Sequence, residues 1–267
     1  MASRIARTLP LAAFVLHSYD WSESSLILDL FTREQGRIAA AAKGAKRPFS
    51  QLRGVLLPFQ RIGVTLGRAL LARRMPAEGD TAEVSNLRSA DWSGGPAMLT
   101  GTALFSGFYL NELLMKLLAR HDPHPALFDA YAATIAALGD PGEARGQSAL
   151  RAFEIVLLKE IGLLPDLGIE TATGRPVRAD ERYRVLADAG VVAAPGATDA
   201  TAGGATLATV QAALASGDVA ALQRVAAGAL AELRPLLRAQ LAYHLGTDSL
   251  RTRRVMLEAQ ALTPAST

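Results

Sequence analysis

The stretch SSLILDLFTREQGRIAAAA at residues 24–42 decides the fold class of this chain. Leu26, Leu28 and Leu30 occupy every second position, which is the period of a half-buried strand. This run at 24–32 is one of five short apolar runs broken by Ser, Gly, Pro or charge, and the others stand at 12–21, 37–46, 55–66 and 68–75. Five runs with no long helix between most of them predict a small closed β-barrel of the OB type, because closure leaves no unpaired strand edge.

A different pattern begins after the polar, glycine-rich passage at 76–96. Apolar residues then recur at three- and four-residue spacing, as on one face of a helix: Leu110, Leu113, Leu114, Leu117 and Leu118. The sequence predicts further helices at 125–138, 148–162, 206–214, 218–244 with a break or kink at Pro235, and 250–261. We therefore predict an α+β chain with an OB-fold domain at 1–78, a mostly α-helical domain at 79–267, and within it an irregular segment at 165–204 with at most a hairpin at 182–192.

The basic residues are concentrated in the predicted barrel. Residues 1–78 hold 12 Lys and Arg against 5 Asp and Glu, whereas the remaining 189 residues hold 16 against 20. A cationic module ahead of a neutral-to-acidic body is typical of a nucleic-acid binder that also carries a separate docking surface.

A surface that binds single strands without reading their sequence needs cations for the phosphates and flat rings for the bases. We expect Phe31 and Phe59, which lie in apolar strand patterns, to belong to the core. An ordinary solvated surface is the alternative for the charges, but a basic cluster beside Gly44 and Pro48 favours phosphate contact. The predicted DNA-binding residues are Arg37, Lys43, Lys46, Arg47, Arg53, Trp21 and Phe49.

Several kinds of chemistry are missing from the sequence. It has no P-loop, no HExxH, no G-x-S-x-G and no cysteine, so it lacks the motifs of nucleotide-driven motors, zinc proteases and thiol enzymes. His121 and His124 fit the loop at a helix start better than a metal site, because Pro123 between them and Pro125 after them break the helical spacing. No apolar run reaches the roughly 18 residues that a membrane helix needs. We expect a cytoplasmic protein that is not an enzyme and holds no cofactor or metal.

The barrel region resembles the N-terminal part of the bacterial recombination-repair family RecO. The resemblance rests on a W-S-E-S-S turn, an L-F-T strand end, a Gly-Arg pair, a K-G-A-K loop, a glycine and a Pro-Phe pair, which stand at 21–25, 30–32, 36–37, 43–46, 54 and 58–59. It continues through the rest of the chain with FSGFYLNELL, LRAFE, GLLPDL, GRPV and LGTDSLRTRR at 105–114, 150–154, 162–167, 174–177 and 245–254. An ordered set of this length is more specific than any single motif.

The resemblance implies a function. Proteins of the RecO family bind and anneal single-stranded DNA, join RecR, and help RecA displace single-strand-binding protein (SSB), without ATPase activity. They are thought to catch the acidic, aromatic-ended tail of SSB in the helical domain, with the arginine of the LRAFE motif, here Arg151, taking part. The residues assigned to that contact are Arg151, Phe153, Lys116 and Arg120, although a surface arginine on an ordinary amphipathic helix would look the same.

One departure from the family concerns zinc. Many relatives carry four cysteines after GLLPDL, whereas this chain continues with GIETATGRPV at 168–177. The segment must therefore fold through packing and turns.

Two other functions stay open at this point. A general single-strand or RNA chaperone would not hold an SSB tail, and a nucleic-acid enzyme would cleave labelled DNA in the presence of a divalent metal.

Overall fold

The computed structural model describes residues 9–74, 81–140, 142–196, 200–247 and 250–262. They form two compact units, described separately below. The first comprises the described residues of Met1–Met98 together with Leu118–Phe128, and the second those of Leu99–Leu117 and Asp129–Thr267.

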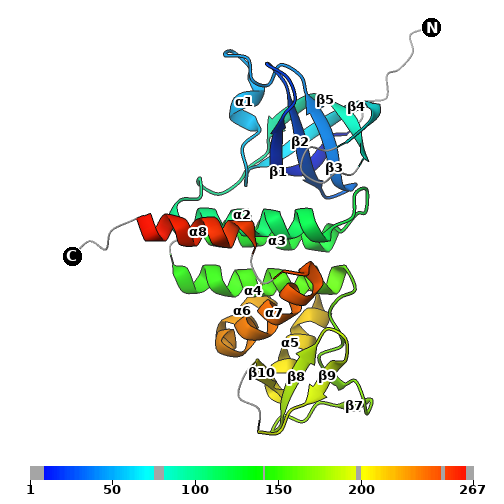
Figure 1. Ribbon diagram of the computed structural model, residues 1–267, viewed down its shortest axis with the longest axis vertical. Coiled ribbons are helices and arrows are strands. Elements are labelled where there is room, and N and C mark those ends of the chain that lie inside the picture. Colours follow the sequence, from blue (N-terminus) through cyan, green and yellow to red (C-terminus); the bar gives the residue numbers. More distant parts are fainter. Residues whose placement is uncertain (1–8, 75–80, 141, 197–199, 248–249, 263–267) are drawn as a thin grey trace. The chain divides into compact units, whose positions relative to one another are not determined.

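The first unit is a closed five-stranded barrel (Figure 1). Its strands are β1 (Leu11–Asp20), β2 (Leu26–Thr32), β3 (Gly36–Ala42), β4 (Arg61–Arg74) and β5 (Thr81–Trp92), with the short helix α1 (Leu52–Val55) between β3 and β4. The order around the barrel is β1-β2-β3-β5-β4, and β1 closes it by pairing with both β2 and β4. All pairs are antiparallel except β3 with β5. The predicted OB-type barrel and α+β class are confirmed.

The barrel extends beyond the predicted domain boundary at residue 78, because β5 lies in the passage at 76–96 that the sequence analysis left without a strand. Its buried apolar residues, Val84, Leu87 and Ala90, stand three positions apart. Register shifts between β4 and β5 produce this spacing. A strand with bulges loses the alternation by which strands are predicted from sequence.

Small side chains fill much of the barrel. The interior includes Val15, Leu28, Leu30, Ile38 and Ile62, together with alanines of β3. Every residue of β3 is buried, so this strand is covered on both faces. Phe31 and Phe59 are also buried, as predicted.

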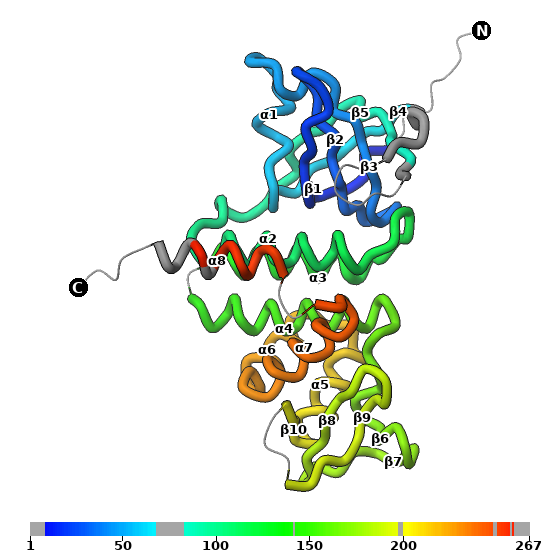
Figure 2. Tube along the Cα trace, viewed as in Figure 1, coloured from blue at the N-terminus to red at the C-terminus, as the bar shows by residue number. Residues whose placement is uncertain are grey.

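The second unit is helical (Figure 2). Its helices are α2 (Gly101–Leu117), most of α3 (Pro125–Gly139), α4 (Glu143–Glu160), α5 (Gly204–Ser216), α6 (Val219–Gly228), α7 (Leu230–Leu245) and α8 (Arg251–Leu262). The predicted helices are confirmed with one correction: the break in 218–244 lies at Gly228 and Ala229, and Pro235 stands inside α7. Glycine is a poor helix former, and the helix ends there.

The irregular segment after α4 contains small sheets and no cysteine. A two-stranded sheet pairs β6 (Ile169–Glu170) with β7 (Arg175–Pro176), and a three-stranded sheet contains β8 (Arg182–Leu186), β9 (Gly190–Ala193) and β10 (Thr201–Gly203). The hairpin predicted at 182–192 is present as β8 and β9, whereas the expectation of at most one hairpin in this segment was wrong, because β6 pairs with β7 and β10 pairs with β8.

Hydrogen bonds and packing hold this segment. The hydroxyl of Thr171 accepts a hydrogen bond of 2.8 Å from the Val191 amide, and the buried Tyr183 hydroxyl accepts one of 2.8 Å from the Arg178 amide. Within the described parts of the chain, no three His, Asp or Glu side chains are grouped so that they could hold a metal ion. Nor is any described helix long and apolar enough to span a bilayer.

Candidate functional site

The basic loop, residues 43–53 between β3 and β4, is fixed to the turn that joins β1 to β2. The Lys46 amide donates to the carbonyl of Ser24 at 3.0 Å, and the Gly44 amide donates to the Ser25 hydroxyl at 3.3 Å. Gly44 has a φ of 72°, in the left-handed region that favours glycine. The loop is therefore ordered, and its side chains project from a defined backbone.

Three predicted cations of the basic loop are exposed to solvent: Lys43, Arg47 and Arg53. No described carboxylate lies within ion-pair distance of them. Lys46 differs, because its ammonium group donates to Asp20 at 2.9 Å and to the Ser22 carbonyl at 3.3 Å. An exposed pair of this kind is weak, so Lys46 remains able to contact a phosphate but is partly neutralised.

The two predicted rings differ in exposure. Phe49 is 99% exposed in the basic loop, so its whole face is available to a base. Trp21 is half-buried and packs against a cluster on the barrel that includes Tyr19, Ile27 and Val84. It lies beside the basic loop, since its turn is the one to which that loop is bonded.

Arg37 is a wrong assignment, because the structure buries it. Its side chain is 4% exposed and forms a bidentate ion pair with Asp29, whose carboxylate is fully buried, at 3.0 and 2.7 Å. It also donates to the Leu118 carbonyl at 3.4 Å. Arg37 therefore ties β3 to β2 and to the chain after α2 and cannot reach a strand outside.

Arg120, assigned to the SSB tail, completes the same buried cluster. Its guanidinium lies 2.8 Å from the Asp29 carboxylate, and its side chain is 14% exposed. Close by, the His121 amide donates to the Arg37 carbonyl, and Phe128 packs against Phe14 with ring centroids 5.2 Å apart. The segment Leu118–Phe128 is thus part of the barrel unit, and the assignment of Arg120 is wrong.

Trp92 is an exposed ring that the sequence analysis missed. It is 63% exposed at the end of β5, and its indole N–H donates to Gln60 at 3.2 Å. Trp92 pairs with Ile62, which pairs with Ala13 near the start of β1, whereas the basic loop adjoins Asp20 at the end of β1. Seven residues of strand separate these ends, about 23 Å. The Asp-Trp pair before a Ser-Gly-Gly turn was the available signal.

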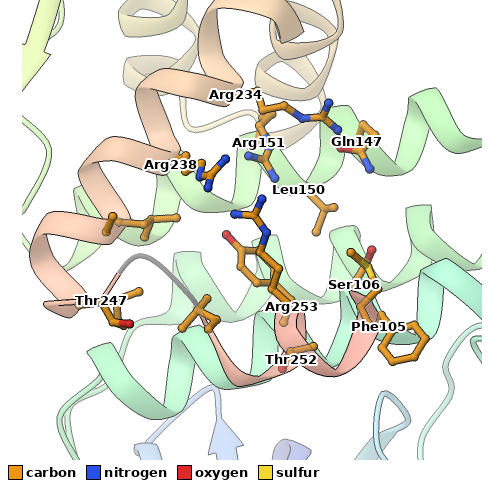
Figure 3. A pocket seen from close by; sticks show the side chains of 16 residues that line it. Phe105, Ser106, Gln147, Leu150, Arg151, Arg234, Arg238, Thr247, Thr252 and Arg253 are labelled. Atoms are coloured by element: carbon orange, nitrogen blue, oxygen red, sulfur yellow. Dashed lines mark hydrogen bonds between the residues drawn. The ribbon is translucent and has the colours of Figure 1, made fainter. Parts of the chain in front are cut away.

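The helical unit contains a cavity of about 430 Å³, called here the helical cavity. Residues of α2, α4, α7 and α8, with the loop between α7 and α8, line it, and the charged residues among them are four arginines (Figure 3). Those four are Arg151, Arg234, Arg238 and Arg253, and none of the lining residues is acidic. Apolar lining comes from Phe105, Leu150, Leu241, Leu245, Leu250 and Met256.

Two acidic residues that do not line the cavity form hydrogen bonds with residues that do. Glu112 of α2 caps the start of α8, because its carboxylate accepts from the amides of Arg251 and Thr252 at 2.9 and 2.8 Å. These bonds hold the pKa of Glu112 below its ordinary value even though burial opposes them. Glu154, fully buried beneath the cavity, accepts from the guanidinium of Arg151 at 2.8 Å and from the hydroxyl of Tyr109 at 2.7 Å.

Of the residues assigned to the SSB tail, only Arg151 lines the helical cavity. Phe153 is a wrong assignment, because its ring is fully buried in the core, 6.1 Å from that of Tyr131. Lys116 is 43% exposed and pairs with Glu112 at 3.5 Å, outside the cavity lining. Three further arginines of the cavity, Arg234, Arg238 and Arg253, were not predicted from the sequence. The first two stand four residues apart on α7, and the third lies in the LGTDSLRTRR landmark.

Comparisons with known proteins agree with this architecture. The family described as "Recombination protein O N terminal" matches residues 8–73, and "Recombination protein O C terminal" matches residues 98–254. The chain is 50% identical to "DNA repair protein RecO" of Polaromonas naphthalenivorans over 251 residues, 94% of this chain and 96% of that protein. Proteins of the same name from Verminephrobacter eiseniae and Variovorax paradoxus are 48% and 49% identical, with the same shares covered. The chain therefore belongs to the RecO family of DNA repair proteins.

Proposed function

We propose that this chain is a mediator of recombinational repair that binds and anneals single-stranded DNA in the cytoplasm. In this proposal it acts with RecR, docks on the tail of SSB, and helps RecA load on SSB-coated strands, without catalysing a reaction itself. The observation that carries the proposal is the basic loop, which presents three exposed cations and an exposed ring within eleven residues of chain.

The basic loop suits a strand bound without regard to sequence. Lys43, Arg47 and Arg53 can each approach a phosphate, and Phe49 offers a face on which any base can stack. Because hydrogen bonds fix the backbone of this loop to the neighbouring turn, its residues lose little further entropy on binding.

The helical cavity suits an acidic peptide that ends in an aromatic residue. Guanidinium groups form strong, charge-assisted hydrogen bonds with carboxylates, and the apolar lining offers a place for a ring. The sequence has no P-loop, which is consistent with a mediator that does not hydrolyse ATP itself. The roles of RecR and RecA come from the family and rest on no residue described above.

Annealing of complementary strands, bare or coated with SSB, tests the proposal. The double variant Arg238→Ala with Arg253→Ala removes two exposed arginines of the helical cavity and leaves the pair between Arg151 and Glu154 in place. We expect it to anneal bare strands normally but SSB-coated strands about tenfold or more slowly, since a hydrogen bond to a charged group contributes roughly 1.5–3 kcal/mol.

The matched control is Arg145→Ala with Arg224→Ala, which removes the same charge from exposed positions outside the cavity lining. This control should anneal both substrates like the wild type. If the cavity variant also anneals coated strands at the normal rate, tail docking in the cavity is ruled out and a general single-strand chaperone is favoured.

A further inference from the structure

Glu154 is a buried carboxylate with an incomplete set of partners. Its side chain is fully buried, and one oxygen accepts both bonds, from Arg151 at 2.8 Å and from Tyr109 at 2.7 Å. Among the described residues, the other oxygen has no hydrogen-bond partner, although it too is buried. The Nε of Arg151 is likewise buried without one. A carboxylate in this position is held in its charged form mainly by the arginine.

Polar and charged groups of three helices act on Glu154. Tyr109 of α2 and Arg151 of α4 are bonded to it, and Arg234 of α7 acts on it at longer range. The charged residue of α6, Arg224, is 72% exposed and lies near Asp218 instead. Burial raises the pKa of Glu154 above its ordinary value, and the two arginines and the tyrosine hydroxyl oppose that effect.

An acidic ligand in the helical cavity competes with Glu154 for Arg151. Arg151 lines the cavity on one side and bonds Glu154 on the other, so any ligand carboxylate that it holds lies close to the Glu154 charge. Like charges in a site without water repel strongly, and a neutral carboxylic acid is much less costly to bury than an ion. Water excluded by the ligand increases both effects.

We propose that Glu154 takes up a proton when an acidic peptide docks in the helical cavity, so that docking and protonation are coupled. This inference rests on the tail docking proposed above. The proton comes from solvent and converts the carboxylate of Glu154 to a carboxylic acid, which frees the charge of Arg151 for the peptide. Glu154 is thus the residue that sets how strongly the cavity attracts acidic partners.

The sign of the coupling follows from linkage. A complex that holds more protons than the free partners is favoured at lower pH. The affinity for an acidic peptide therefore rises as the pH falls below the pKa of Glu154 in the complex, and it levels off below the pKa of Glu154 in the free protein. For one proton taken up in full, the gain is tenfold for each pH unit.

Calorimetry on the wild-type protein with the acidic C-terminal peptide of SSB measures the proton directly. Titrations at one pH in two buffers of different ionisation enthalpy should give different heats, in the proportion that net proton uptake requires. Equal heats in both buffers would overturn the proposal. Absence of any binding would overturn the docking on which it rests, so the two failures are distinguishable.

Glu154→Gln gives a second test. The proposal predicts that this variant binds the peptide more tightly, whereas a purely structural role of Glu154 predicts weaker binding. Glutamine is nearly isosteric, can still accept from Arg151 and Tyr109, and carries no charge. We expect this variant to bind the peptide roughly tenfold more tightly at neutral pH, with a flatter pH profile, because the cavity gains one net positive charge. A pH dependence that arises from the peptide's own carboxylates persists in this variant and can be subtracted.

Tyr109→Phe is the control for packing, because it removes the hydroxyl bond to Glu154 and keeps the ring. It should retain the proton uptake seen in the wild type. Weaker peptide binding by Glu154→Gln in a protein with a normal melting curve would show that Glu154 merely positions Arg151, and would overturn the proposal.

Discussion

Single-stranded DNA is expected to bind about a hundredfold more weakly at 0.1 M salt when Lys43, Arg47 and Arg53 are all replaced by alanine. These three cations are exposed in the basic loop, so each can approach a phosphate. Each phosphate contact on a single strand contributes roughly 0.7 to the slope of log K against log salt, so the slope should fall by about 2. Titrations of oligothymidylate at several salt concentrations measure both quantities.

The matched control removes three exposed arginines from the helical unit: Arg145, Arg184 and Arg224. It changes the net charge equally and should leave affinity and slope nearly unchanged. Lys46→Ala alone should have a smaller effect than Lys43→Ala, because Asp20 already engages the ammonium group of Lys46. Equal losses in the two triple variants would mean that overall charge, and not the basic loop, governs binding.

The largest effect on stability is expected from Arg37→Ala, which should lower the free energy of unfolding by about 3–5 kcal/mol. The substitution removes the bidentate partner of Asp29, a fully buried carboxylate, and leaves it with Arg120. Breaking a buried ion pair on one side is costly because the remaining charge cannot regain water. Unfolding in urea, followed by circular dichroism, gives the value.

Arg53→Ala is the comparison for that measurement, since Arg53 is exposed and has no described ion-pair partner. It should change the free energy of unfolding by less than about 0.5 kcal/mol. At a temperature where Arg37→Ala is folded, this variant should bind single-stranded DNA like the wild type. Normal stability together with weakened DNA binding would restore Arg37 as a DNA contact.

The five predicted runs fall on four of the five barrel strands, because the runs at 55–66 and 68–75, predicted as separate strands, both belong to β4. Leu26, Leu28 and Leu30 alternate along β2, and the register of the sheet preserves that alternation. Strand β5 was missed because bulges against β4 put its buried residues at spacing three. The helices were predicted well, since each has an apolar stripe and a Gly or Pro near its ends.

The site residues were harder to predict, because burial depends on partners that are distant in sequence. Arg37 looks like the other cations near it until the pairing of β2 with β3 brings it to Asp29. The helical cavity collects its arginines from α4, α7 and α8, more than 100 positions apart at the extremes, so no local pattern shows that they meet. Phe49 is exposed, as expected from its place beside Pro48 in a loop, because no such partner buries it, and its contact with DNA stays a prediction.

Fluorescence of single-tryptophan variants tests the location of the DNA-binding surface most directly. The chain has two tryptophans: Trp21, next to the basic loop, and Trp92, at the other end of the barrel. In Trp92→Phe, addition of oligothymidylate should change the emission of Trp21, whereas in Trp21→Phe the emission of Trp92 should stay constant. A response from Trp92 alone would contradict binding at the basic loop.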